Sequence, residues 1–477
     1  MLFSSITFLI LFLPLVLLVY YYCPAIKAKN YFLLFASLVF YAWGEPKYVL
    51  VMLLSIAINY RMGLWIGETS YSTSKRKVIL AMAITANLLL LFYFKYLGFS
   101  EQVINKILRM IDYPQFQIPV LNIALPIGIS FYTFQSISYL VDVYKKPALV
   151  QKNMLDLGLY ISLFPQLIAG PIVRYHDINE QIKNRTHRLG IFVQGIERFI
   201  IGLAKKVLIA NTMARAADGI LALKPDSVPA FYLLLGIVSY SLQIYYDFSG
   251  YSDMAIGLGK MFGFDILENF NYPYVSKSVT EFWRRWHISL SSWFKDYLYI
   301  PLGGNRKGKI RTTVNLFIVF LTTGLWHGAA LNFVFWGFGH GVLLFIEKTF
   351  GKRLGAHFKE GIIKNIISHV YTLCSIMLLW VFFRLGIRSS LNFIRNLFLL
   401  NSGSDNIQLY IKLIIDTQYY VYLFWAVLFA FPWWRKIHIP EKFHSPPVRY
   451  IALIVLLVLS ICTLATNAYN PFIYFRF

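Results

Sequence analysis

The chain has 477 residues, of which 58% are hydrophobic and only 14% are charged. Soluble domains carry about 25% charged residues, so this composition argues against a water-soluble protein and indicates one that uses the lipid bilayer as solvent. The formal net charge of +23 does not indicate a nucleic-acid partner, because basic residues crowd the short loops of membrane proteins, where they fix the topology and meet anionic membrane lipids.

Apolar runs of about 20 residues, the length needed to cross the hydrocarbon core, recur along the chain. Clear examples lie at residues 6–22, 78–94, 314–326 with its continuation, and 450–465. We expect an all-α polytopic membrane protein with about eleven transmembrane helices, built as a single domain over residues 1–477. No Lys or Arg precedes the first run, so it is expected to be a retained helix and not a signal peptide.

The charges of the first loops suggest an orientation. Lys27 and Lys29 follow the first span, and Lys75, Arg76 and Lys77 form the third loop. The positive-inside rule places these two loops in the cytoplasm and the amino terminus outside.

Two apolar segments are interrupted in ways that a simple membrane-spanning helix would not tolerate. Pro165 and Gly170 break residues 160–175, and residues 272–302 mix aromatic side chains with charges. Broken helices are stable at membrane depth only where protein or a cavity satisfies the freed backbone groups. We therefore expect both segments to be re-entrant and packed inside a helical bundle.

Polar and charged residues concentrate between residues 243 and 341. Ionisable groups at membrane depth are costly, and they persist when they are paired or line a cavity. Asp247 and Asp253 are candidates either for a direct role or for partners of Arg284 and Arg285. The arginines themselves have an equally simple explanation as interfacial anchors.

His327 is the strongest candidate for a catalytic residue. It lies inside an apolar run, beside Trp326 and between two glycines (324 and 328) that would let a substrate or another backbone approach. His287 lies 40 residues earlier, in the second interrupted segment. Two such imidazoles suit acyl transfer, because one can take the proton of an attacking hydroxyl while the other orients the substrate or stabilises the oxyanion.

Other histidines carry weaker signals. The glycines around His340 favour a structural role in close helix packing, and five further histidines lie near charged loops and are expected to be solvated: His176, His187, His357, His438 and His444. A metal site made by two histidines and an aspartate is an alternative, but no tight ligand spacing supports it, so no metal is expected. The signatures of serine hydrolases and P-loop enzymes are also missing.

Five segments together resemble the membrane-bound O-acyltransferase (MBOAT) family, most closely its bacterial branch that includes the membrane subunit of alginate O-acetylation. The segments are 164–174 (FPQLIAGPIVR), 246–253 (YDFSGYSD), 282–290 (FWRRWHISL), 299–306 (YIPLGGNR) and 326–329 (WHGA). The resemblance extends over about residues 1–390, with the motif-bearing core at about 120–345.

The resemblance implies a site and a reaction. His327 would be catalytic and His287 its partner, both facing a central tunnel. The further candidates for lining or supporting this tunnel are Trp326, Asp247, Asp253, Trp286, Arg284, Arg285, Asn305 and His340. The implied protein lies in the bacterial cytoplasmic (inner) membrane. It binds no permanent cofactor, takes acetyl groups from acetyl-CoA in the cytoplasm, and works with a secreted or membrane-anchored SGNH-type protein that modifies a polysaccharide acceptor.

The leading hypothesis is therefore O-acetylation of a cell-surface or secreted polysaccharide such as alginate, cellulose or peptidoglycan. One departure affects the acyl group: acetyl-type relatives often carry a tryptophan shortly after the last motif, where this chain has Leu331 and Asn332. D-alanyl transfer to teichoic acid is the nearer alternative. A transporter or lipid flippase is the alternative from another class, and a non-catalytic scaffold ranks last because it leaves the histidines without a purpose.

Overall fold

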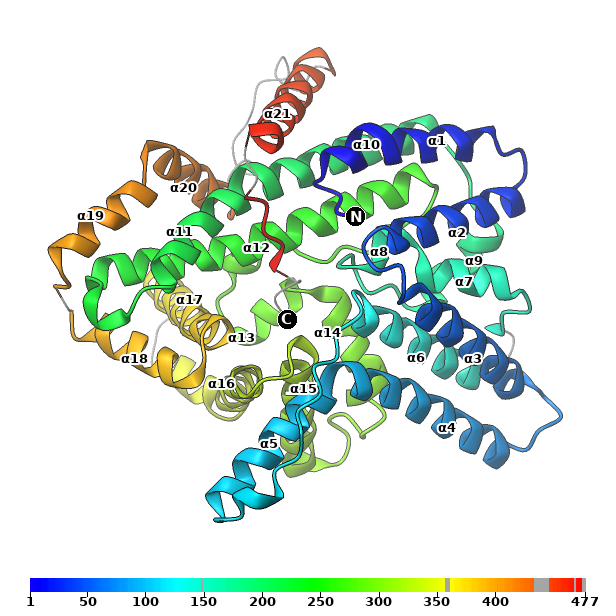
Figure 1. Ribbon diagram of the computed structural model, residues 1–477, viewed down its shortest axis with the longest axis horizontal. Coiled ribbons are helices and arrows are strands. Elements are labelled where there is room, and N and C mark those ends of the chain that lie inside the picture. The colour runs from blue at the N-terminus through cyan, green and yellow to red at the C-terminus, as the bar shows by residue number, and fades with distance from the viewer. Residues whose placement is uncertain (147–148, 357–360, 401, 433–445, 467–468, 474–477) are drawn as a thin grey trace. The chain divides into compact units, whose positions relative to one another are not determined.

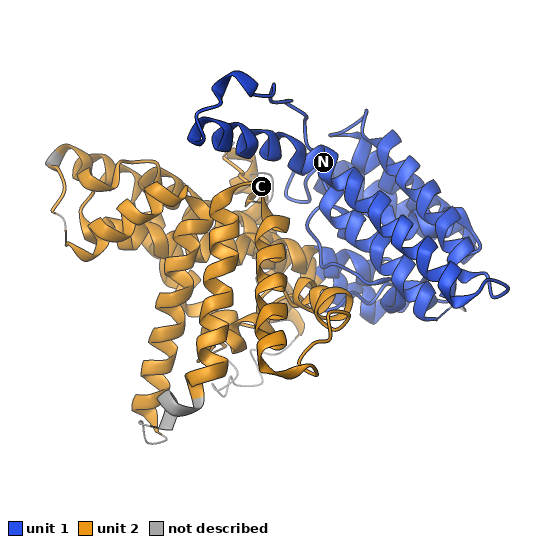
Figure 2. Ribbon diagram, turned by 90° about the horizontal axis from the view of Figure 1, so that it is seen from below, with its two compact units in different colours: residues 1–196, 255–267 blue, residues 197–254, 268–477 orange. Residues whose placement is uncertain are grey.

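The structure is a computed structural model that describes residues 1–146, 149–356, 361–400, 402–432, 446–466 and 469–473. Across these residues the chain forms helices joined by loops, without strands (Figure 1). It divides into two compact units, Met1–Ile196 with Ala255–Leu267, and Glu197–Met254 with Glu268–Phe477 (Figure 2). The expectation of a single domain stays a prediction.

Unit 1 holds the amino-terminal helices. They are α1 (Leu13–Tyr22), α2 (Ile26–Ala42), α3 (Val49–Gly67), α4 (Thr73–Leu91), α5 (Leu97–Met110), α6 (Ile129–Lys145), α7 (Met154–Ser162), α8 (Phe164–Leu167) and α9 (Tyr175–Lys183). Two long helices, α10 (Leu189–Ala204) and α12 (Ala230–Met261), contribute residues to both units.

Unit 2 holds the remaining helices. They are α11 (Asn211–Leu221), α13 (Val279–Arg285), α14 (Ile288–Phe294), α15 (Gly308–His327), α16 (Leu331–Ala356), α17 (Ile362–Arg384), α18 (Ile387–Phe398), α19 (Asp405–Ile414), α20 (Thr417–Phe429) and α21 (Pro446–Thr466). Its buried core is rich in aromatic side chains contributed by α12, α13, α16 and α17.

Several described helices are long and apolar enough to cross a membrane. They are Val49–Gly67, Thr73–Met110 (α4 and α5 joined by a wide turn), Ile362–Arg384 and Pro446–Thr466, and Phe8–Tyr22 is a shorter apolar helix. Length and composition thus support four spans among the described residues. The expected number of about eleven stays a prediction.

The segment 160–175 is broken, as its prolines and glycine predict. Helix α7 ends at Ser162, α8 has only four residues, and residues 163–173 are all buried. The segment is held by its own polar groups: Tyr160 donates to the carbonyl of Val173 (3.0 Å), and the Gln166 amide donates to the carbonyl of Tyr160 (2.6 Å). These side-chain bonds take the place of helical ones and stabilise the turn.

In unit 2, α15 and α16 pack against each other through their glycines. A Cβ at Gly324 would lie 2.3 Å from the carbonyl oxygen of Phe333, and a Cβ at Gly337 would lie 2.2 Å from that of Phe320. The two backbones therefore approach more closely than any larger side chain allows. This contact fixes the end of α15, where His327 lies.

Candidate active site

His327 is the last residue of α15, and aromatic rings surround it. Its imidazole centroid lies 5.0 Å from that of Trp326, 5.3 Å from Trp336 and 5.1 Å from Phe383, all at steep angles. Only 8% of His327 is exposed. The ring is thus held in an apolar box that excludes most water.

Helix α15 ends at His327, although the apolar run in which this histidine lies continues beyond it in the sequence. Gly328 has an extended backbone and ends α15, and a Cβ there would lie 2.2 Å from the Phe333 ring. Ending the helix releases the chain to turn into α16. The position beside Gly328 is therefore filled by protein, and the glycine serves close packing.

His287 lies at the start of α14 in a left-handed conformation (φ 45°, ψ 53°). Such a conformation costs a non-glycine residue about 1–3 kcal/mol and persists only where the surroundings impose it. Asn269 supplies that constraint, because its carbonyl accepts from Ile288 N (2.9 Å) and its side-chain oxygen accepts from Ser289 N (3.2 Å). His287 is completely buried.

The same asparagine defines the tautomer of His287. The backbone N–H of Ser289 can only donate, so the oxygen of the Asn269 amide faces α14 while its nitrogen donates to Ser252 Oγ (3.0 Å). His287 Nδ1 lies 3.2 Å from this oxygen and must therefore carry the proton. In the neutral ring the lone pair is then on Nε2, which is the nitrogen able to accept a proton or a hydrogen bond.

Trp326 lies beside both candidate imidazoles. Its ring centroid lies 6.1 Å from that of His287 and 5.0 Å from that of His327. The structure thus brings the three residues together from α14 and the end of α15, as the sequence predicts.

His340 lies deeper in α16 and is fully buried. Its Nδ1 accepts a hydrogen bond from Trp283 Nε1 (3.1 Å), and its ring packs 4.7 Å from that of Trp336. Trp336 therefore touches both His340 and His327. His340 supports the wall of the aromatic box.

The two aspartates of α12 have partners other than the predicted Arg284 and Arg285. Asp247 forms a buried ion pair with Lys206 Nζ (2.6 Å). Asp253 binds Arg198 and Lys205, both at 2.6 Å. The nearest cations in space come from α10 and the turn after it, some 40 to 55 residues away in sequence, which spacing alone could not show.

The remaining predicted residues lie at different places in unit 2. Arg284 and Asn305 are exposed, whereas Arg285 bonds Glu281 Oε1 (2.9 Å) one turn earlier. Trp286 is buried, with its ring 5.4 Å from Phe282 in a stacked pair. Trp286 is thus a packing residue of the core.

Leu331 and Asn332 stand where acetyl-type relatives often carry a tryptophan, but His327 still has aromatic neighbours on α16. Leu331 is 46% exposed, and the Asn332 amide donates to the carbonyl of Phe382 (3.2 Å). Besides Trp326, a second indole packs on His327, that of Trp336, which lies one turn further along α16. Tryptophan thus lies beside the candidate histidine in this chain as well.

Sequence reasoning missed Asn269 and Lys206. Neither carries a local signal, because each acts on a residue 18 or more positions away. Lys206 is 1% exposed, and the carbonyl of Pro471 also accepts from it. The backbone N–H of Ile473 in turn donates to Asp247 (2.8 Å). The carboxy-terminal segment thereby binds the buried ion pair.

A small cavity of about 190 Å³ lies along α15. It is lined by Trp283, Leu290, Ser291, Phe294, Lys295, Tyr299, Leu316, Val319, Phe320 and Thr323. Thr323 precedes His327 by one helical turn and so shares its side of α15. The cavity is mainly apolar, and its lining along α15 ends one helical turn before His327.

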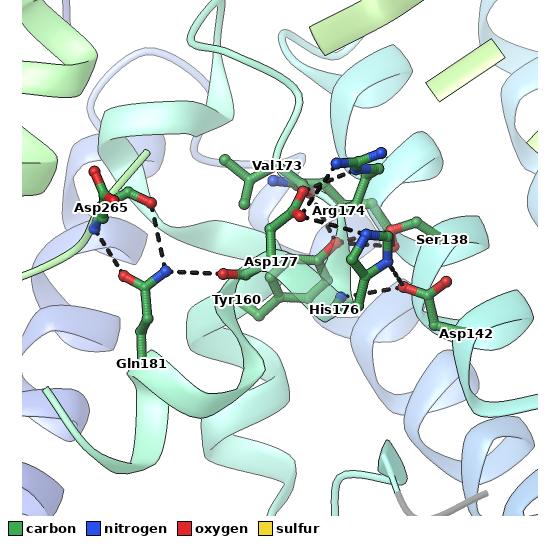
Figure 3. A network of polar contacts seen from close by, with 10 residues as sticks. Ser138, Asp142, Tyr160, Val173, Arg174, His176, Asp177, Gln181 and Asp265 are labelled. Atoms are coloured by element: carbon green, nitrogen blue, oxygen red, sulfur yellow. Dashed lines mark hydrogen bonds and ion pairs between the residues drawn. The ribbon is translucent and has the colours of Figure 1, made fainter. Parts of the chain in front are cut away.

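Unit 1 contains a histidine of a different kind (Figure 3). His176 Nδ1 lies 2.8 Å from Asp142 Oδ2, and its Nε2 lies 3.3 Å from Asp177 Oδ1, which Arg174 also binds. The hydrogen bond with Asp142 raises the pKa of His176 above its usual 6.5. This histidine is 40% exposed, but it is fixed by carboxylates and is not simply solvated.

His187 is likewise bound rather than free in solvent, with Nε2 2.8 Å from the Tyr20 hydroxyl. The other three histidines expected to be solvated, at 357, 438 and 444, lie outside the described residues.

Comparison with known proteins adds independent findings. The sequence model of the membrane-bound O-acyltransferase family matches residues 145–387. The chain is 45% identical over 385 residues to the probable alginate O-acetylase AlgI of Pseudomonas aeruginosa, covering 80% of this chain and 72% of that protein. It is 39% identical over 499 residues to AlgI of Pseudomonas putida, covering both chains completely. The peptidoglycan O-acetyltransferase of Helicobacter pylori is 37% identical over 443 residues, covering 85% of this chain and 81% of that protein.

Proposed function

This chain belongs to the membrane-bound O-acyltransferase family, and we propose that it transfers acetyl groups for the O-acetylation of a cell-surface or secreted polysaccharide, with His327 and His287 at the reacting centre. The resemblance seen in the motifs is thus confirmed. The chain is an enzyme and a polytopic membrane protein. The relatives at 37–45% identity are named for alginate and peptidoglycan O-acetylation, which supports the acetyl group over D-alanine.

The enclosure of His327 is the observation that carries the catalytic assignment. In acyl transfer a hydroxyl oxygen attacks the acyl carbonyl carbon, the bond to the leaving group breaks, and the hydroxyl proton must move to a base. A neutral imidazole in an apolar box suits this step, because water is excluded and the ring is already oriented by three aromatic neighbours. His327 takes the proton and returns it to the leaving group.

The tautomer of His287 refines its role. With Nδ1–H donated to Asn269, the neutral ring presents an acceptor at Nε2. Nε2 therefore suits accepting a hydrogen bond from a substrate N–H, because the single proton of the attacking hydroxyl goes to His327; once protonated, Nε2 would donate to the oxyanion. We assign His287 as the residue that positions the substrate beside His327.

The donor and the partner follow from the family and not from a bound molecule. A thioester such as acetyl-CoA supplies the acetyl group and leaves as a thiol that takes up the proton held by His327. The acyl group enters from the cytoplasmic side, and the acceptor hydroxyl comes from the outer side. A secreted or membrane-anchored SGNH-type protein then passes the group to the polysaccharide.

The expected topology fits this reaction. We expect about eleven spans, re-entrant segments at 160–175 and 272–302, and an amino terminus outside. The buried and broken backbone of residues 163–173, and the short helices α13 and α14, support such segments. The protein then resides in the cytoplasmic membrane of a bacterium.

Deletion of the gene tests the function. Polysaccharide from the deletion strain should lose ester-linked acetate and regain it on complementation with the intact gene. Ester-linked D-alanine, measured on the same samples, should stay unchanged. Loss of D-alanine with retained acetate would contradict the proposal in favour of teichoic acid modification. No change in either ester would favour a transport function.

A further inference from the structure

A large cavity of about 1010 Å³, lined by both polar and apolar side chains, lies in unit 1 at the end of α3. Its residues are far in sequence from those of the candidate active site. It is lined by Arg61, Leu64, Trp65, Gly67, Glu68, Thr69, Tyr71, Val150, Gln151, Lys152 and Lys183. Its volume is at the upper end of the range for small-molecule sites. The function proposed above does not use it.

The charges of this cavity favour an anion. Arg61, Lys152 and Lys183 contribute three cations against the single carboxylate of Glu68. Glu68 Oε1 is occupied by Ser70, whose N–H and hydroxyl both donate to it (3.2 and 3.0 Å). Among the described residues, none of the three cations forms an ion pair with a carboxylate, so their charge is available to a ligand.

Gln151 adds a buried donor. It is 4% exposed, and its side-chain oxygen accepts from the backbone N–H of Asn153 (3.1 Å), which fixes the orientation of the amide. The amide nitrogen is therefore the end left over, and it is buried without a hydrogen-bond acceptor within the described part of the chain. A buried donor of this kind costs about 1–3 kcal/mol unless an acceptor reaches it.

The neighbouring backbone makes the site rigid. A Cβ at Gly67 would lie 2.8 Å from Val150, so the loop that carries Gln151 is pressed against the end of α3. Tyr60 donates to the carbonyl of Lys152 (2.9 Å), and Arg76 donates to the carbonyls of Ile66 (2.7 Å) and Tyr144 (3.0 Å). The cavity is thus a preformed feature of unit 1.

The position of the cavity at the end of a membrane-spanning helix favours a membrane lipid as the source of the anion. Helix α3 is apolar and of membrane-spanning length, and the cavity extends from its end back to Arg61, a distance of about 9 Å at 1.5 Å per residue. Trp65, whose ring packs 5.0 Å from the Arg61 guanidinium, and Tyr71 are of the type that lies at the level of lipid headgroups. Leu64 and Val150 add apolar surface for the first carbons of an acyl chain.

We propose that this cavity binds the headgroup of an anionic phospholipid such as phosphatidylglycerol. The phosphodiester oxygens accept from the Gln151 amide and from Arg61, Lys152 and Lys183, while Trp65 and Tyr71 flank the glycerol. The lipid would hold the loop of residues 149–153 against the end of α3.

Lipid binding to the purified full-length chain tests the proposal. Native mass spectrometry would count bound dioleoyl-phosphatidylglycerol and dioleoyl-phosphatidylcholine for the intact protein and for three variants. The double variant Arg61→Gln, Lys183→Gln should bind phosphatidylglycerol about 20–30-fold more weakly, at about fivefold for each cation. Gln151→Glu should weaken it about tenfold, because a carboxylate of the same shape repels the phosphate. Lys106→Gln, an exposed lysine on α5, should change nothing.

The lipid-binding results can overturn the proposal in two ways. Equal binding of the two lipids, or equal binding by Gln151→Glu and Lys106→Gln at unchanged melting temperature, would overturn the proposal. A Gln151→Leu variant separates loss of the donor from added charge, and it should bind phosphatidylglycerol more weakly, with its melting temperature showing the cost of the lost bond from Asn153 N–H. Displacement of the lipid by 3′,5′-adenosine diphosphate at the same residues would show that the phosphate comes from a nucleotide donor, and the lipid assignment would then be wrong.

Discussion

Two histidine environments in this molecule contrast sharply. His327 and His287 in unit 2 are surrounded by aromatic rings, and the neutral amide of Asn269 fixes the second of them. His176 in unit 1 lies between two carboxylates and is partly open to solvent (Figure 3). All three occur in or beside segments that match the family motifs, so sequence position alone does not separate them.

The contrast between these environments shows that neighbouring residues decide whether a histidine side chain is charged or neutral, and therefore what it can do. A carboxylate neighbour favours the charged imidazole, which then acts as a fixed cation in an ion-pair network. Aromatic and amide neighbours leave the imidazole neutral, with a lone pair available to take a proton. On this reading the unit 2 histidines do chemistry and the unit 1 histidine stabilises a turn. Each prediction below tests one side of that contrast.

After His327, the largest loss of acetylation is expected for His287, the second imidazole of the candidate site. His287→Ala should lower polysaccharide acetylation by about 10²–10⁴-fold, the range for a positioned acid–base group. His187→Ala, a histidine of unit 1 bonded to Tyr20, is the matched control and should retain acetylation. Ester-linked acetate per amount of membrane-inserted protein is the readout. A drop of less than threefold in His287→Ala would show that this residue is structural.

Asn269 should affect acetylation because its side-chain oxygen fixes the orientation of the His287 ring. Asn269→Ala removes the oxygen that fixes Nδ1 and should lower acetylation by about 10–100-fold. Asn269→Asp keeps an acceptor oxygen but, as a carboxylate, favours the charged imidazole, so its acetylation should recover only as the pH rises and His287 loses its proton. A merely structural role would leave both variants without such a pH dependence. Acetate released from the purified polysaccharide at several pH values measures the difference, and equal pH profiles for the two variants would remove Asn269 from the site.

Trp283 tests whether His340 belongs with the chemistry or with the packing. Trp283→Phe keeps a ring but leaves the buried Nδ1 of His340 without its donor, at a cost of about 1–3 kcal/mol in stability. We expect a lower melting temperature in detergent and acetylation within about threefold of the unaltered protein. A loss of activity above tenfold at unchanged melting temperature would place His340 among the catalytic residues.

His176 should show the smallest effect and a pH dependence. Because its pKa is raised in the folded protein, its ion pairs stabilise fully below the ordinary value of 6.5 and are lost as the pH rises through the folded value. The melting temperature of the unaltered protein should therefore exceed that of His176→Asn at pH 6 and approach it at high pH. At pH 6 the free energy of unfolding should differ between the two proteins by about 0.5–1 kcal/mol, a small value because the His176 side chain is partly exposed.

The control for this measurement is His187→Asn, which lacks the carboxylate partners of His176 and should show no such convergence. A constant difference between His176→Asn and the unaltered protein across the pH range would contradict the ion-pair account.

Much of this organisation could be predicted from the sequence, because it depends on local patterns. The prolines and glycine of residues 160–175 predict a broken segment, and the structure has α7, α8 and α9 there. His327 and His287 stand out because an ionisable group in an apolar run is costly. The motif spacing carries the family, which the comparisons confirm.

The rest depends on contacts between distant residues. The ring of Trp336 faces His327 only because α16 turns back along α15, and the Lys206–Asp247 pair joins residues 41 positions apart. The end of α15 at His327 was also hidden, since Gly328 can continue or end a helix and only the close packing of Phe333 decides which. A sequence pattern shows that an ionisable residue lies in a costly apolar setting, whereas the residue that pairs with it is known only from the structure.

One measurement tests the central claim most directly: ester-linked acetate in a deletion strain that expresses His327→Ala or His327→Gln. We predict no detectable acetate for either variant, although both reach the membrane in normal amounts and His327→Gln, which nearly preserves the side-chain volume, melts close to the unaltered protein. Acetylation retained in either variant would contradict the assignment of His327 as the proton-accepting residue of the transfer.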